Sequence, residues 1–221
     1  GTAAIATTLL TLLKSGDHIV ASSSLYGGTY NLLSVTLPRH GITTTFVDPS
    51  NPNNFQNAAQ ENTRVFFIES LGNPKLDVLD IEAISVKAKN YKVPLIVDNT
   101  VATPYLLNPI AYGANIVIQS LTKYINGNGT ALGGAIIDAG TFDWGSGKFP
   151  EFTEPSAGYH GLIYNEVIGA ASFIAKVRIE GLRDYGAALS PFNAFQIIQG
   201  LETLEVRILK HSQNALELAQ W

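Results

Sequence analysis

Residues 116–129 read IVIQSLTKYINGNG, in which an apolar run leads through two hydroxyl side chains and a lysine into a glycine loop. Apolar runs of strand length, without polar alternation, are typical of strands buried on both faces of a parallel sheet. Lys123 therefore lies where a buried strand is expected to end. Glycines let a backbone approach a bound group closely. We expect Lys123 to face a ligand, the ordinary alternative being a solvated surface lysine.

Runs of the same kind alternate with helical patterns along the chain. Further strands are expected at His18–Ala21, Thr43–Val47, Val65–Ile68, Leu95–Val97 and Gly134–Ile137, with helices at 2–14, 28–38, about 80–90, 162–184 and from Ser190-Pro191 onward, where Gly200 is expected to bend the helix. This order predicts an α/β fold, a mostly parallel sheet covered by helices on both faces. Residues 48–53 are expected to form a loop, and 140–161 a long ordered loop that is a candidate lid or subunit contact.

Polar segments follow three of the expected strands. They are Glu69–Asn73, Asp98–Thr100 and Ser120–Lys123. Because ligands of such sheets bind at the carboxyl ends of the strands, we expect these segments to converge. An amine nucleophile, a carboxylate at a buried strand end and hydroxyl groups for a phosphate are together what pyridoxal phosphate (PLP) requires of a protein.

Each candidate residue has an ordinary alternative. Lys123 would form a Schiff base with the cofactor, and Asp98 would pair with its ring nitrogen, although an Asp at a strand end is often a turn residue. Ser120 and Thr122 would donate to the phosphate or simply cap a turn. The helix that starts at Gly1 and Thr2 offers N–H groups to the same anion.

Two further residues complete the predicted site. Tyr26 precedes Gly27-Gly28, glycines that would let a flat ring lie against the face of the tyrosine, so it is a candidate for stacking. Asn73, in Gly72-Asn73-Pro74, is from spacing alone equally well an ordinary turn residue.

Composition excludes several classes of function. The formal net charge of −4, from 14 basic and 18 acidic residues, argues against a nucleic-acid groove or an anionic membrane surface. The absence of cysteine excludes disulfides and thiolate metal sites, and the four histidines show no pairing that suggests a metal. With no apolar run of membrane-spanning length, a cytoplasmic protein is the default expectation. The low charged fraction of 14% suggests that another subunit covers part of the surface.

Both ends of the chain lie inside helical patterns, so we expect the middle of a longer protein. Residues 1–185 are expected to form a large cofactor domain that is truncated at its N-terminus. Residues 186–221 are expected to form a long helix that leads towards a missing C-terminal domain.

Four motifs carry a family resemblance: Tyr26–Thr29, Glu69–Pro74, Val97–Thr100 and Ser120–Tyr124. In their order and spacing they resemble the Cys/Met-metabolism family of PLP-dependent enzymes, which has the aspartate-aminotransferase-like (type I) fold. Within that family the chain is most similar to the O-acetylhomoserine sulfhydrylases, through the stretches 158–162, 180–184, 189–194 and 200–204.

The resemblance implies a role for each matched position. Lys123 corresponds to the Schiff-base lysine, which is also the proton shuttle, and Asp98 to the partner of the pyridine nitrogen. Tyr26 corresponds to the stacking tyrosine, and Asn73 to the asparagine near the phenolic oxygen. The implied phosphate and other cofactor contacts are Gly1, Thr2, Thr100, Ser120 and Thr122. At Leu121 and Asn128 the chain departs from the residues that relatives often carry, and neither difference removes a cofactor contact.

The resemblance also implies a reaction. It is a γ-replacement on O-acetyl-L-homoserine by sulfide or a thiol, in methionine biosynthesis, by a homodimer or homotetramer with active sites at subunit interfaces. The isolated fragment is expected to be inactive. Alternatives are a cystathionine γ-synthase, a methionine γ-lyase or an O-succinylhomoserine sulfhydrylase of the same family. A nucleotide-binding dehydrogenase is disfavoured because no G-x-G-x-x-G turn follows the first strand, and a catalytically silent homologue because Lys123 and Asp98 are intact.

Overall fold

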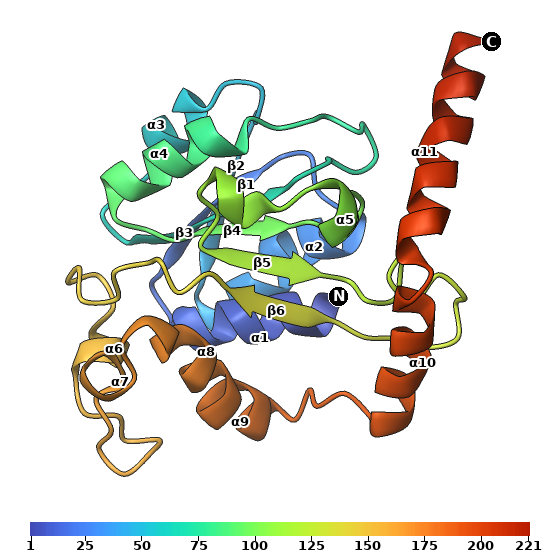
Figure 1. Cartoon of the computed structure of the whole chain (residues 1–221). Helices are drawn as coiled ribbons and strands as arrows, with labels where there is room; N and C mark the ends of the chain where they lie inside the picture. Colours follow the sequence, from blue (N-terminus) through green and yellow to red (C-terminus); the bar gives the residue numbers. More distant parts are fainter.

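The computed structural model describes residues 1–221, which fold around one six-stranded sheet (Figure 1). Its strands are β1 His18–Ser22, β2 Thr43–Val47, β3 Thr63–Glu69, β4 Leu95–Asp98, β5 Ile116–Gln119 and β6 Ala135–Asp138. They lie in the order β2-β1-β3-β4-β5-β6. All pairings are parallel except that of β5 with β6. The prediction of a mostly parallel sheet is therefore confirmed, with one antiparallel edge strand.

Apolar side chains point to both faces of the sheet. In β3, Val65 and Phe67 belong to one core cluster while Phe66 and Ile68 belong to the other, and all four are fully buried. Helix α1 (Thr2–Leu12) and the helices between 164 and 182 cover the first face. Helices α3 (Asn53–Ala58) and α4 (Ile81–Tyr91) cover the second. Two-sided burial explains why the strand sequences lack polar alternation.

The helices differ from the expected ones in detail. The segment expected at 28–38 consists of α2 Gly27–Asn31, a π-helix Leu32–Thr36 and a 3₁₀ turn Leu37–His40. Between β4 and β5 lie α5 Thr103–Leu106 and a 3₁₀ turn Pro109–Tyr112. The helix expected at 162–184 is interrupted at Gly169, which has a φ of 65°. It comprises α7 Tyr164–Val167, a 3₁₀ turn Gly169–Ala171, α8 Ser172–Lys176, a π-helix Val177–Leu182 and α9 Arg183–Tyr185.

The segment 140–161 is anchored in the core. Trp144, Phe149 and Phe152 are buried and pack against Phe173, with ring centroids of Trp144 and Phe173 at 5.5 Å. The short helix α6 (Pro150–Thr153) carries one of these rings. Three buried aromatic side chains fix such a segment in place. These rings anchor residues 144–152, whereas residues 153–161 are mostly exposed, and the interpretation of the segment as a lid or subunit contact stays a prediction.

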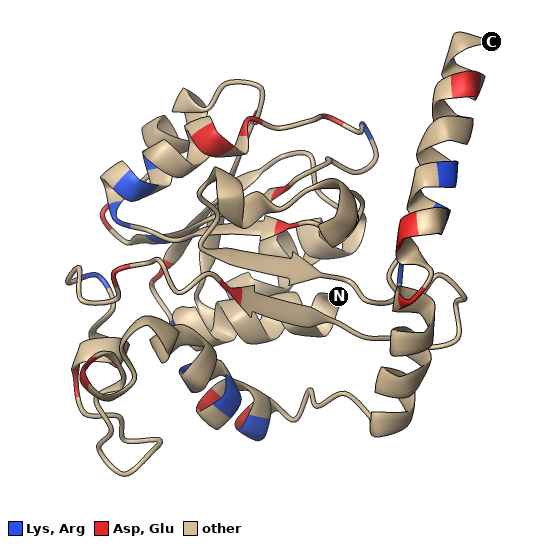
Figure 2. Ribbon diagram, in the orientation of Figure 1, with Lys and Arg blue, Asp and Glu red and all other residues tan.

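The chain closes with α10 (Pro191–Leu201) and α11 (Leu204–Gln220). Ser190 caps α10 as predicted, since its hydroxyl accepts from Asn193 N at 3.4 Å. Helix α11 extends beyond the sheet in Figure 1, and residues 211–221 are all exposed. In Figure 2, basic and acidic residues are interspersed along α4 and α11, whereas α1 and α10 contain none. None of the helices combines the length and apolar character needed to cross a membrane.

Candidate cofactor site

One cavity of about 1150 Å³ opens at the carboxyl ends of the parallel strands. All of the predicted site residues line it: Gly1, Thr2, Tyr26, Asn73, Asp98, Thr100, Ser120, Thr122 and Lys123. The structure thus brings together segments that follow β1, β3, β4 and β5, as expected from the order of strands and polar segments in the sequence.

Asp98 ends β4 and is 7% exposed. Its Oδ1 accepts from Thr100 N at 3.0 Å and from Thr100 Oγ1 at 2.5 Å, and no protein group donates to Oδ2. Burial raises the pKa of this carboxyl above its ordinary value. A carboxylate buried here without a cationic side chain is costly. Asp98 therefore fits a cationic partner that enters from the cavity.

Thr100 links the ends of two strands. Its hydroxyl donates to Asp98 and accepts from Ser120 N at 2.8 Å, which ties the end of β4 to the residue after β5. Thr100 therefore orients Asp98 and Ser120. Because its hydroxyl already donates to Asp98, it has no proton left to donate to a ligand.

Lys123 lies in the turn that follows β5. Its backbone N–H donates to Ser120 O at 3.2 Å, and its carbonyl accepts from Gly127 N at 2.8 Å. The side chain is exposed on the cavity wall and forms no ion pair. Its Nζ lies 5.9 Å from the centroid of the Tyr26 ring. The structure thus presents an unpaired primary amine beside an aromatic face.

Tyr26 follows β1 and is 48% exposed. A Cβ at Gly28 would lie 2.5 Å from Tyr26 Cε1, so the glycine makes room for the tyrosine ring itself. The expectation that these glycines clear space for a ligand ring is therefore wrong for Gly28, whereas the space beside Gly27 is open. The ring still borders the cavity, where a flat group could stack on it.

The N-terminus of α1 forms one end of the cavity. The helix has no side-chain cap and no acidic residue in its first turn, so its first N–H groups suit an anion. Thr122 Oγ1 donates to Gly133 O at 3.3 Å and accepts from Gly133 N at 3.2 Å. No protein group bonds the Ser120 hydroxyl, which lies close to Gly1. Of the two hydroxyl groups that follow β5, Ser120 is therefore the one that remains available to a phosphate.

The predicted site residues omit other residues of the cavity, among them Arg178, Asn193 and Glu69, although the sequence predicts that the segment beginning at Glu69 converges there. Glu69 stands at the end of a buried strand, a signal that could have identified it. Burial, with a smaller contribution from Asp98, raises the pKa of its carboxyl to about 8, although the Tyr26 N–H opposes this. Arg178 and Asn193 reach the cavity from helical segments. Nothing in the sequence pattern of these segments indicates that they pack beside this edge of the sheet.

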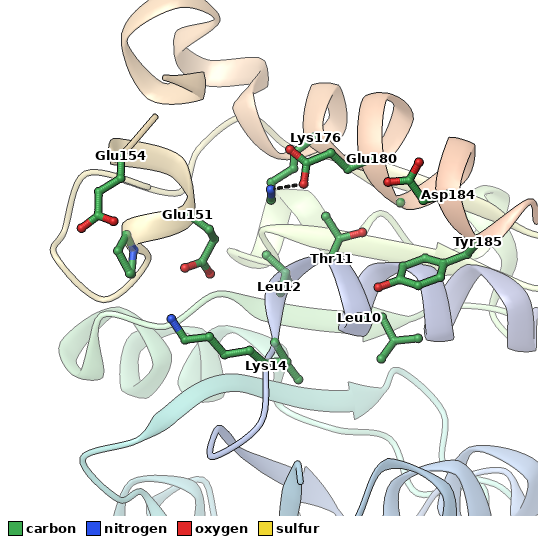
Figure 3. Close-up of a pocket in the computed structure, with 13 residues that line it drawn as sticks. Leu10, Thr11, Leu12, Lys14, Glu151, Glu154, Lys176, Glu180, Asp184 and Tyr185 are labelled. Atoms are coloured by element: carbon green, nitrogen blue, oxygen red, sulfur yellow. Dashed lines mark hydrogen bonds and ion pairs between the residues drawn. The ribbon is translucent and has the colours of Figure 1, made fainter. Parts of the chain in front are cut away.

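A second cavity, of about 390 Å³, shares no residue with the first (Figure 3). Its charged groups include the ion pair between buried Lys176 and half-buried Glu180, with Nζ and Oε2 at 2.5 Å. Ser156 and Tyr164 also donate to Glu180, so this carboxylate is fully bonded within the protein. None of the predicted residues lies there.

The parallel sheet, with this lysine and aspartate at its carboxyl edge, defines the type I fold of PLP-dependent enzymes. A solved structure from Campylobacter jejuni, assigned as an O-acetylhomoserine (thiol)-lyase and carrying a pyridoxyl-lysine phosphate, matches 99% of the chain with a TM-score of 0.93 and 41% identity. The O-acetylhomoserine sulfhydrylase of Wolinella succinogenes matches all of it, with a TM-score of 0.88 and 40% identity. These matches cover 54% and 59% of the two solved chains.

The chain belongs to the Cys/Met metabolism PLP-dependent enzyme family, whose sequence model matches residues 1–221. It is 55% identical to the O-acetyl-L-homoserine sulfhydrylase of Leptospira meyeri over 96% of its length, and 49% identical to the homocysteine synthase of Schizosaccharomyces pombe over all of it. The chain spans about half the length of these relatives, 50% and 52% respectively. The predicted family and fold class are thereby confirmed.

Proposed function

We propose that the full-length protein catalyses a γ-replacement in which sulfide or a thiol displaces acetate from O-acetyl-L-homoserine. The observation that carries this proposal is the meeting of the Lys123 amine, the buried Asp98 carboxyl and the N-terminus of α1 around one cavity. The names of the relatives support this substrate over O-succinylhomoserine or a γ-lyase reaction.

PLP, when bound, would supply a ring that withdraws electrons from the substrate's reacting carbons. Asp98 would hold a proton on the pyridine nitrogen, and Thr100 would keep the carboxylate in place. The first amides of α1 and the Ser120 hydroxyl would bind the phosphate, with Thr122 completing the wall. Tyr26 would stack on the ring.

Lys123 would hold the cofactor covalently through Nζ and, once substrate replaces it, move the proton of the substrate's α-carbon. Its lack of an ion pair supports this role, since no carboxylate competes for the amine. Asn73, exposed on the cavity wall, would contact the phenolic oxygen and the substrate.

We infer that the protein assembles as a homodimer or homotetramer. Helix α10 presents Phe192, Phe195 and Ile198, which are 68%, 55% and 54% exposed, so its outer face is apolar. Apolar patches of this kind mark contact surfaces. We also propose that residues 1–185 form a cofactor domain and that residues 186–221 form a helical segment leading to a C-terminal domain. A cytoplasmic location belongs to the same proposal.

The test is homocysteine formation by the full-length protein from O-acetyl-L-homoserine and sulfide, with O-succinyl-L-homoserine and cysteine as competing substrate and acceptor. We expect the acetyl ester with sulfide to be preferred. Lys123→Ala should abolish turnover, and Lys89→Ala, at an exposed position of α4, should leave it unchanged. Preference for the succinyl ester with cysteine would assign a cystathionine γ-synthase instead. Wild-type turnover in Lys123→Ala would refute the assignment of the lysine.

A further inference from the structure

Glu69 is a buried glutamate on the wall of the cofactor cavity, and the proposed chemistry gives it no task. It ends β3 and is 5% exposed. In the parallel register it lies directly beside Asp98 of β4. Two carboxyl groups therefore stand side by side where the site needs only one negative charge.

The single side-chain hydrogen bond of Glu69 connects it to the stacking residue. Its Oε1 accepts from the backbone N–H of Tyr26 at 2.7 Å. Tyr26 is half exposed, so the core does not hold its ring. Its own carbonyl accepts from Tyr30 N at 2.9 Å within the next helix turn. The Glu69 contact is thus the bond that fastens the backbone of Tyr26 to the sheet.

We propose that Glu69 is a positioning residue of this site. By accepting a hydrogen bond from the Tyr26 amide, it holds the Tyr26 backbone against the strand end beside Asp98 and so fixes the position of the Tyr26 ring at the cavity. In this role it acts through Tyr26 and is not itself a catalytic residue. This inference rests on the proposed cofactor site and extends it to a residue outside the predicted set.

The charge state of Glu69 fits this task. Burial raises the pKa of its carboxyl to about 8, and the neighbouring Asp98 adds to the shift. The ionisable groups that line the cavity with it are Asp98 on β4, Tyr26 after β1, Lys123, Arg178 and the amine of Gly1. Near neutral pH, Glu69 is therefore a neutral acid whose oxygen accepts from Tyr26, which leaves Asp98 alone to meet a cation. A glutamine offers the same neutral acceptor.

Amide hydrogen exchange of the full-length protein without cofactor tests the contact itself. The variants are Glu69→Gln, Glu69→Ala and, as a control at an exposed site just before the same strand, Glu61→Ala. Loss of a hydrogen bond to a buried group should speed exchange of the Tyr26 amide about tenfold in Glu69→Ala. Glu69→Gln and Glu61→Ala should stay within about twofold of wild type. Unchanged exchange in peptides of β3 and β4 establishes that each variant is folded.

The second readout is the dissociation constant for PLP. We expect Glu69→Ala to bind about tenfold more weakly and Glu69→Gln to bind like wild type, in parallel with the exchange rates. Unchanged Tyr26 exchange in Glu69→Ala would overturn the proposal. Equal damage by Gln and Ala would also overturn it, because an ionised carboxylate would then be required. Since exchange is measured without cofactor, failure of the positioning role is distinguishable from failure of the proposed function.

Discussion

Replacement of Gly200 by alanine should disturb the loop that follows Lys123. Gly200 lies in α10 and packs directly on the backbone of Asn126, a fully buried residue. A Cβ at Gly200 would overlap the Asn126 carbonyl oxygen and lie 2.5 Å from its carbon and 2.8 Å from its Cα. Real Cβ contacts stay beyond 3.0 Å, so backbone must move. The loop has little room to do so, because the Asn126 side-chain Nδ2 donates to Ala131 O at 3.1 Å and its backbone N–H donates to Leu121 O at 3.0 Å.

Two effects of opposite sign decide how much Gly200→Ala changes the free energy of unfolding. Overpacking costs about 1–3 kcal/mol, whereas alanine in place of glycine stabilises a helix interior by up to about 1 kcal/mol. Because the clash is with backbone and not with a flexible side chain, we expect a net loss of about 2 kcal/mol of unfolding free energy. Gln199→Ala, at the exposed neighbouring position, should change this free energy by less than about 0.5 kcal/mol.

The assay is urea unfolding of the full-length protein, combined with the dissociation constant for PLP. The Gly127 amide bonds to the Lys123 carbonyl, so displacement of Asn126 should also weaken cofactor binding. A Gly200→Ala variant with wild-type stability and wild-type cofactor affinity would refute the proposed contact between α10 and this loop.

Three further predictions concern the strand ends. Thr100→Val should lower the unfolding free energy by about 1–3 kcal/mol, because the Ser120 N–H and Asp98 lose their shared partner, and urea unfolding measures this. Asp98→Asn should weaken PLP binding about 10- to 100-fold by titration, since a neutral amide does not hold a proton on the ring nitrogen; equal affinity would contradict this role. Without cofactor, the unfolding free energy should fall as pH rises from 4.5 to about 8, because folded Glu69 holds its proton more tightly than the unfolded chain. Glu69→Gln should reduce that slope, and an unchanged slope would show that Glu69 ionises normally.

The strands and their polar ends could be predicted because burial on both faces requires apolar residues at every position of a strand, followed by polar residues where the strand ends. The runs at 65–68 and 116–118 are apolar at every position, so the limits of these strands can be recognised without knowing which strands pair with them. The residues that follow them meet because parallel strands bring their carboxyl ends to one edge. For the same reason, the predicted residues line a single cavity.

The remaining features depend on partners distant in the sequence. The direction of β6 is invisible in its composition, since Ala135–Asp138 reads like any other buried strand. Helix α3 has one fully buried apolar residue, Phe55, among Asn and Gln, and so resembles a loop. The Glu69–Tyr26 bond and the Gly200–Asn126 contact join elements that only the folded sheet brings together.

Covalent attachment of PLP to Lys123 is the central claim, and borohydride reduction tests it most directly. The full-length protein with PLP should show a visible absorption band that borohydride abolishes, and mass mapping should place the reduced adduct on Lys123. An adduct on another lysine, or a full-length protein that shows no band, would contradict the account.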